Sequence, residues 1–253
     1  MTAPSRSSRR APLRAATIGL ALLLGACTVD GAGAPPGTTA TTPRPAAVAP
    51  PDVASTRPYR NIAVPFPAGN WTLVGEVVDT RDAGPPQRQA VWASDAGGVI
   101  DRLVTVRHEP RPPRSTFAPF AGCADARYPH AAVYRNARDD QACWHVRPVS
   151  LGLAGEPPAL HFLIAEFAER RDLVLPPTMI GVRFVGTGGA GRHAIEYLFN
   201  ADLLAPAAGR RLWRPADWTA AAVARDPRRR GVVAAFRDWG ERWSIAALPP
   251  PGS

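Results

Sequence analysis

The side chains that most often carry out chemistry in proteins are few and scattered in this sequence. The five histidines are His108, His130, His145, His161 and His193. No two of them have the spacing of a metal-ligand pair, so we expect no metal site. His130 and His145 could meet in space near Asp139 or Asp140 and form a small site, or they could be solvated loop residues. The sequence leaves both alternatives open.

Motifs with a known chemical mechanism are also missing. The sequence has no Gly-x-Ser-x-Gly elbow, no His-Glu-x-x-His zinc motif, no phosphate loop and no dinucleotide-binding glycine pattern. The glycine-rich residues 186–191 look superficially like a phosphate cradle. However, they lie between two predicted strands and do not precede a helix, so we interpret them as a hairpin turn. We therefore predict no cofactor, and an enzymatic function stays undecided.

The start of the chain has the layout of an export signal. An apolar run over residues 15–26 follows four arginines, Arg6, Arg9, Arg10 and Arg14. This run is shorter than the about 20 residues that a membrane-spanning helix needs, but it suits the core of a signal peptide. We therefore predict that residues 1–26 are a signal peptide.

The residues that close this run, Leu24-Gly25-Ala26-Cys27, resemble the bacterial lipobox. In lipoproteins with this motif, signal peptidase II cleaves before the cysteine, which carries a diacylglycerol thioether and an acylated amine, commonly a palmitate. The resemblance implies that Cys27 is lipidated and holds the protein on the periplasmic side of a cell membrane. Thr28 stands where an aspartate would retain a lipoprotein at the inner membrane, which favours the outer membrane. An ordinary secretory signal with a chance cysteine is the alternative.

The two other cysteines, Cys123 and Cys143, are separated by 20 positions. If Cys27 is lipidated, these two are the remaining thiols, and an even pair in an oxidising compartment is expected to form a disulfide. Closing a loop of this length contributes about 3 kcal/mol to stability in the chain-entropy model. A redox-active pair is the alternative, but catalytic cysteines usually lie closer together in the sequence.

The formal net charge of +9 overstates the charge of the exported protein. Four arginines belong to the predicted signal peptide, so +5 remains, and the chain contains no lysine. Apart from Arg228-Arg229-Arg230, the arginines are scattered and do not alternate with aromatic residues, so we expect no nucleic-acid binding. The expected partners are the membrane, through the lipid anchor, and an unknown envelope protein, glycan or lipid.

The exported part divides into a tether, one domain and a short tail. Residues 27–58 are rich in Thr, Pro and Ala and cannot bury enough apolar surface to fold, so we predict a disordered spacer there. Residues 59–248 are sufficient for a single globular domain with a hydrophobic core. Residues 249–253 are predicted to fray.

Period-two patterns predict a mostly antiparallel sheet. We expect strands over residues 59–66, 71–79, 87–94 and 99–107, another from about Trp144, and a hairpin over 178–200. Short links between the strands of 71–107 favour a meander. In the hairpin, a turn at Gly189-Ala190 pairs Phe184 with Ile195, Val182 with Tyr197 and Ile180 with Phe199 on one face. The same register places Arg183 beside Glu196 on the other face.

Helical periodicity predicts three helices. The clearest covers residues 157–171, where Leu160, Leu163, Ile164 and Phe167 share one face. We expect this helix to be long and central and to pack on the apolar face of the hairpin. Two C-terminal helices are expected, over residues 215–224 and beyond Asp226, which we predict to be an N-cap.

The tryptophans of the C-terminal region allow two interpretations. Trp213, Trp218, Trp239 and Trp243 lie in or near the two predicted helices. Trp213 and Trp218 could form an exposed binding surface for a ligand or glycan. The alternative is that all four are core residues where the helices cover the sheet.

These patterns predict an α+β domain: a mostly antiparallel sheet with a long central helix and two C-terminal helices packed on one face. The predicted function is that of a cell-envelope lipoprotein with a non-enzymatic binding, structural or accessory domain. A periplasmic hydrolase with a site assembled from distant residues and a lipid carrier with a large apolar cavity are the alternatives.

Overall fold

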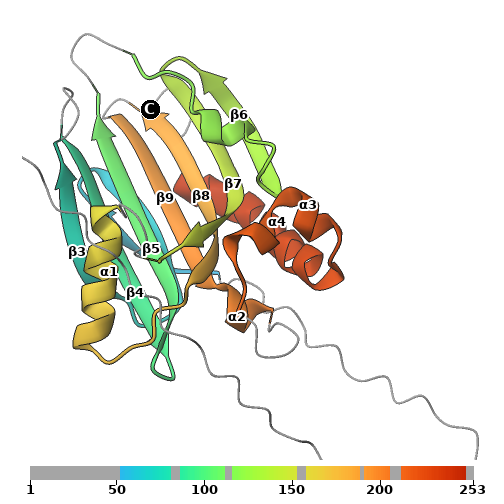
Figure 1. Ribbon diagram of the computed structural model, residues 1–253. Helices are drawn as coiled ribbons and strands as arrows, with labels where there is room; N and C mark the ends of the chain where they lie inside the picture. Colours follow the sequence, from blue (N-terminus) through green and yellow to red (C-terminus); the bar gives the residue numbers. More distant parts are fainter. Residues whose placement is uncertain are drawn as a thin grey trace, which may run out of the picture. The chain divides into compact units, whose positions relative to one another are not determined.

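A seven-stranded antiparallel sheet forms the centre of the domain (Figure 1). The computed structural model describes residues 52–80, 86–111, 116–152, 158–188, 191–205 and 212–248. The order across the sheet is β3-β4-β5-β9-β8-β7-β6. The strands are β3 (Thr72–Asp79), β4 (Gln87–Ala96), β5 (Val99–Pro110), β6 (His130–Ala137), β7 (Asp140–Ser150), β8 (Thr178–Gly188) and β9 (Gly191–Asn200). The predicted meander and hairpin are thus joined side by side in one sheet.

The hairpin of β8 and β9 has the predicted register. Phe184 pairs with Ile195, Val182 with Tyr197 and Ile180 with Phe199. Arg183 pairs with Glu196 on the opposite face. The predicted turn residues Gly189 and Ala190 lie outside the described residues, as do Cys27, the rest of 1–51 and the tail 249–253.

The first strands differ from the prediction. Instead of one strand over 59–66, the chain forms a hairpin of β1 (Val53–Tyr59) and β2 (Ile62–Pro67). It turns at Arg60, whose φ of 58° is left-handed. Residues 53–58, which we assigned to the tether, therefore belong to a paired strand. The backbone of these residues pairs with β2, and the Arg57 guanidinium lies 4.8 Å from the centre of the Phe66 ring. The strand lacks an alternating apolar pattern, so the sequence did not predict it.

One face of the sheet packs against the C-terminal helix α4 (Pro227–Ala247) and against β1 and β2. Tyr197 in β9 contacts two tryptophans of α4 edge-on, with ring centres 5.2 Å from Trp239 and 4.8 Å from Trp243. Gly240 of α4 lies directly over Trp144, where an added Cβ would come within 2.6 Å of the ring. Asp226 caps α4 as predicted, because its side chain accepts from the backbone N–H groups of residues 228 and 229.

The other face packs against helix α1 (Ala159–Arg170), which lies over β3 and β4 (Figure 1). Leu160, Ile164 and Phe167 are buried there with Leu103 and Leu198. The prediction that this helix covers the apolar face of the hairpin was therefore wrong, because α4 occupies that face. With 12 residues, α1 is also neither long nor central. Helical periodicity shows which side of a helix is buried, but it does not show which face of a sheet receives it.

The predicted helix over residues 215–224 is divided. A 3-10 turn, η2 (Pro215–Trp218), is followed by the short helix α3 (Ala220–Ala224). Thr219 separates them because its backbone is extended, and its side chain caps α3. A further short helix, α2 (Ala201–Leu204), follows β9, and the 3-10 turn η1 (Ala121–Ala124) precedes β6. In the described part of the chain, no helix is long and apolar enough to cross a membrane.

Candidate anion-binding site

The two predicted disulfide partners come together at one end of the sheet. Cys123 in η1 and Cys143 in β7 are at bonding distance, and their Cα atoms are 6.0 Å apart. Beside them, residues 116–124 cross the sheet face that α1 leaves open. The Gln141 side chain donates to the Ala118 carbonyl at 2.6 Å, and the Phe117 N–H donates to Asp139 Oδ1 at 2.8 Å. This segment, which we call the covering segment, is thereby fixed on the sheet.

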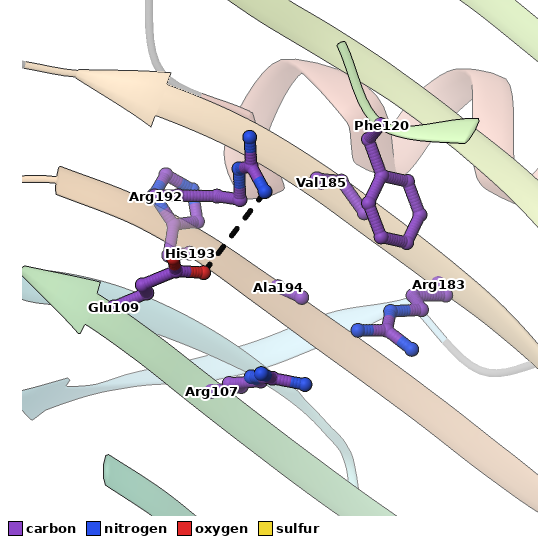
Figure 2. Close-up of a pocket in the computed structure, with 8 residues that line it drawn as sticks. All are labelled: Arg107, Glu109, Phe120, Arg183, Val185, Arg192, His193 and Ala194. Atoms are coloured by element: carbon purple, nitrogen blue, oxygen red, sulfur yellow. Dashed lines mark ion pairs between the residues drawn. The ribbon is translucent and has the colours of Figure 1, made fainter. Parts of the chain in front are cut away.

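Under the covering segment, three arginines from three strands surround Ala194 (Figure 2). Strand pairing explains their meeting, since Arg107 of β5 pairs with Ala194 of β9. Arg192 lies two residues before Ala194 on the same face, and Arg183 of β8 pairs with Glu196, two residues after it. The small Ala194 side chain leaves a cavity of about 70 Å³ between the guanidinium groups. We call this the three-arginine site.

Aromatic rings of the covering segment orient two of the arginines. The Arg192 guanidinium lies 4.6 Å from the centre of the Phe117 ring, and that of Arg183 lies 5.4 Å from the Phe120 ring. Arg192 Nη2 also donates to the Ala118 carbonyl at 2.6 Å. The third, Arg107, donates from Nη2 to the Gln87 side chain. These contacts hold the groups in place without neutralising their charge.

The same donor atom is unsatisfied in each of the three arginines. The Nε atoms of Arg107, Arg183 and Arg192 are buried and have no hydrogen-bond partner among the described residues. Buried polar groups in native proteins are nearly always paired, so three such atoms around one cavity point to a missing acceptor. The one acidic side chain lining this cavity in the described structure is Glu109, whose Oε2 is 4.0 Å from Arg192 Nη1 (Figure 2).

The electrostatics also show incomplete charge compensation. Burial lowers the pKa of the Arg183 guanidinium, and the negative charge of Glu196 only partly offsets this effect. Burial likewise lowers the pKa of Arg192, with partial compensation from Glu109. Arginine nevertheless stays protonated in proteins, so the site presents positive charge.

Although Arg183 and Glu196 are neighbours across the two strands, the ion pair of Glu196 is formed with Arg147 of β7. Arg147 Nε donates to Glu196 Oε1 at 2.5 Å, and Nη2 donates to Oε2 at 2.8 Å. Burial alone would raise the pKa of Glu196, but the charge and the hydrogen bonds of Arg147, aided by the charge of Arg183, lower it to about 2. This bidentate pair is neutral overall and leaves Arg183 available for another anion.

A second cavity of about 320 Å³ shares Arg107, Arg183 and Ala194 with the three-arginine site. It extends along the same sheet face towards α1, over Thr105 and the Arg147–Glu196 pair. Towards α1 it is lined by the apolar side chains of Val149, Leu151, Leu160, Ile164 and Leu198. Asp79, Gln89 and His161 also line this cavity.

The histidines do not form the small site that we considered. On the paired strands β6 and β7, His130 and His145 point to opposite faces of the sheet. His145 stacks on Tyr128 with ring centres 4.6 Å apart, and burial lowers its pKa to about 3. Across the described residues, no group of three or more His, Cys, Asp or Glu side chains could hold a metal ion.

The tryptophan pair belongs to the core. Trp213 and Trp218 lie edge to face with ring centres 5.5 Å apart, but Trp218 is fully buried. The Trp213 indole N–H donates to the Ala205 carbonyl. These two residues therefore do not form the exposed aromatic surface that a binding role would need.

The three arginines were not among the site residues predicted from the sequence. One signal was present, because the predicted hairpin register already placed Arg183 on the face opposite the apolar one, together with Arg192. Nothing in the sequence, however, places Arg107 of the meander next to β9. No protein-family model, curated protein or solved structure matches the chain. The three-arginine site is accordingly the feature of the described structure from which a function can be inferred.

Proposed function

We propose that this protein is a cell-envelope lipoprotein, held on the membrane through Cys27, whose domain binds a small oxyanion at the three-arginine site without transforming it. The observation that carries the anion proposal is the set of three unpartnered, buried guanidinium Nε atoms around Ala194. The lipobox motif supports the anchor, and the Cys123–Cys143 pair is consistent with an oxidising compartment.

The size and chemistry of the cavity favour an oxyanion. Its volume of about 70 Å³ exceeds the space that a single water molecule needs, which leaves room for one carboxylate, phosphate or sulfate group. Arginine matches the geometry of these groups because its planar fork donates parallel hydrogen bonds to two oxygens. An anion here would pair the free Nε donors and compensate the excess positive charge.

The same surroundings favour binding over catalysis. A hydrolase needs a general acid or base whose pKa lies near the working pH. Glu196, which lines the larger cavity next to the three-arginine site, has a pKa lowered to about 2 and is occupied by Arg147. His145 is buried with a pKa lowered to about 3. Neither group is suited to accept a proton and return it at neutral pH.

The proposal predicts that Arg183→Met weakens anion binding. The substitution removes the charge but keeps an unbranched apolar side chain at this position. A hydrogen bond to a charged group contributes about 1.5–3 kcal/mol, so the affinity for inorganic phosphate should fall about tenfold to a hundredfold. Isothermal titration of the full chain carrying Cys27→Ser, which has no attached lipid, measures this affinity.

Arg242→Met is the matched control. Arg242 lies on α4, on the other side of the sheet, and its side chain is 58% exposed. This variant should bind phosphate as tightly as the parent chain. The proposal is wrong if the parent chain binds no phosphate, sulfate or acetate, or if Arg183→Met and Arg242→Met bind phosphate equally well.

A further inference from the structure

The two cavities form one continuous path along β9 whose chemistry changes from end to end. Arg192, Ala194, Glu196 and Leu198 follow one another on the same face. The first two line the three-arginine site, and the last lies at the apolar end of the larger cavity. Leu198 is four positions after Ala194, a length of about 13 Å at about 3.3 Å per residue.

The middle of the path carries no net charge. Its floor is the bidentate Arg147–Glu196 pair, with the uncharged Thr105 beside it. The path therefore offers one positively charged end, a neutral ion pair at its centre and five apolar side chains towards α1, with Asp79, Gln89 and His161 also on its lining. An inorganic anion would leave most of the 320 Å³ empty.

We infer that the ligand is an amphipathic oxyanion, with a carboxylate or phosphate at the three-arginine site and a short apolar chain extending towards Leu198 and α1. This inference rests on the proposed anion binding and specifies the ligand class. The volume of about 320 Å³ is at the lower end of the range for small-molecule sites, which matches a single short chain.

Titration with alkyl phosphates of increasing length, from methyl to octyl phosphate, tests the inference on the full chain carrying Cys27→Ser. Each methylene that enters an apolar site contributes about 0.8 kcal/mol, so the affinity should rise about fourfold per methylene and then level off once the cavity is filled. A parallel series from acetate to octanoate should show the same rise. The series that binds more tightly identifies the head group as phosphate or carboxylate.

Val149→Asn tests the apolar end directly. Val149 is partly buried in β7 and lines the larger cavity, away from the arginines. The variant should keep its affinity for inorganic phosphate and lose about tenfold for octyl phosphate. Val78→Asn is the matched control, because Val78 is a 45% exposed strand residue outside both cavities, and it should change neither affinity.

The outcomes separate this inference from the proposed function. If inorganic phosphate binds but methyl and octyl phosphate bind equally well, the amphipathic ligand is ruled out and simple anion binding stands. If phosphate, sulfate, the alkyl phosphates and the carboxylates all fail to bind, both proposals fail. A rise with chain length that Val149→Asn leaves unchanged would also overturn the inference, because the chain would then lie elsewhere.

Discussion

Glu196 and Arg183 face each other across β8 and β9, yet their electrostatic situations differ. Glu196 holds two hydrogen bonds from Arg147 and is 7% exposed, whereas the Nε of Arg183 has no partner among the described residues. This unsatisfied cation beside a satisfied ion pair is the basis of our proposal that Arg183 binds an anion.

The pairing of these two residues could be predicted, but the partner of Glu196 could not. A short turn joins β8 and β9, so the apolar pattern and the turn length fix the register that places Arg183 beside Glu196. Arg147 comes from β7, 49 residues earlier in the chain. Its approach depends on the pairing of β7 with β8, which no local pattern specifies.

Glu196→Gln should remove part of the acid sensitivity of the fold. In the folded chain the pKa of Glu196 is about 2, below its ordinary value of 4.5. Its contribution to stability is therefore fully present above pH 4.5 and is lost as the pH falls towards 2, by about 3 kcal/mol. Urea unfolding across this pH range measures the loss.

At neutral pH, Glu196→Gln should be less stable than the parent chain by about 3–5 kcal/mol, because it leaves Arg147 buried without its counter-charge. The difference between the two proteins should shrink as the pH falls below 4.5. A constant difference down to pH 2 would show that the ionisation of Glu196 is not linked to folding.

At the scale of elements, the covering segment connects the cysteine pair to the three-arginine site. Cys123 fixes η1 on β7, and the preceding residues bring Phe117 and Phe120 over two of the arginines. The disulfide was predicted from the proposed export signal and the even number of remaining cysteines. Its role in the site was not, because the aromatic–arginine contacts depend on the path of a proline-rich segment.

Replacing both cysteines by alanine should affect stability and binding together. The chain-entropy model gives a loss of about 3 kcal/mol in the free energy of unfolding. Each cation–π contact that is no longer held in place contributes about 0.5–1 kcal/mol, so the phosphate affinity should fall by about tenfold. Denaturant unfolding and phosphate titration measure the two effects.

Phe120→Leu serves as the matched variant, because it keeps the disulfide and removes one ring. It should reproduce part of the loss in affinity with a smaller loss in stability. Full phosphate affinity in the folded double cysteine variant would mean that the covering segment does not organise the arginines.

The helices show a second limit of prediction at this scale. The apolar side of α1 was predicted correctly, since Leu160, Ile164 and Phe167 are buried. The sheet face on which α1 packs was predicted wrongly, because β8 and β9 carry buried side chains on both of their faces. The face that carries the aromatic residues packs against the tryptophans of α4, and the shorter α1 packs on the other face.

At the scale of the whole molecule, the mostly antiparallel character of the sheet was predictable from period-two patterns and short connections. The pairing of β5 with β9 could not be predicted, because these strands are far apart in the sequence. This pairing brings Arg107 to Ala194 and so completes the site. Local sequence patterns therefore predict the strands of the sheet, but they do not predict where these strands form a cavity.

The proposed anchor predicts that Cys27→Ser loses its attached lipid. The parent chain should label with radioactive palmitate and sediment with membranes after a high-salt wash. The variant lacks the thiol that would carry the lipid, so it should lose the thioether-linked lipid. Unchanged labelling in the variant would exclude Cys27 as the lipidation site.

The three-arginine site is tested most directly by an NMR titration that follows arginine Nε–Hε signals as inorganic phosphate is added to the full chain. We expect the signals of Arg107, Arg183 and Arg192, each assigned by its loss in the corresponding Arg→Met variant, to shift together and saturate with one dissociation constant. The signal of Arg242 should not move. Unchanged signals at the three positions, or small unsaturated shifts spread over exposed arginines, would contradict anion binding at this site.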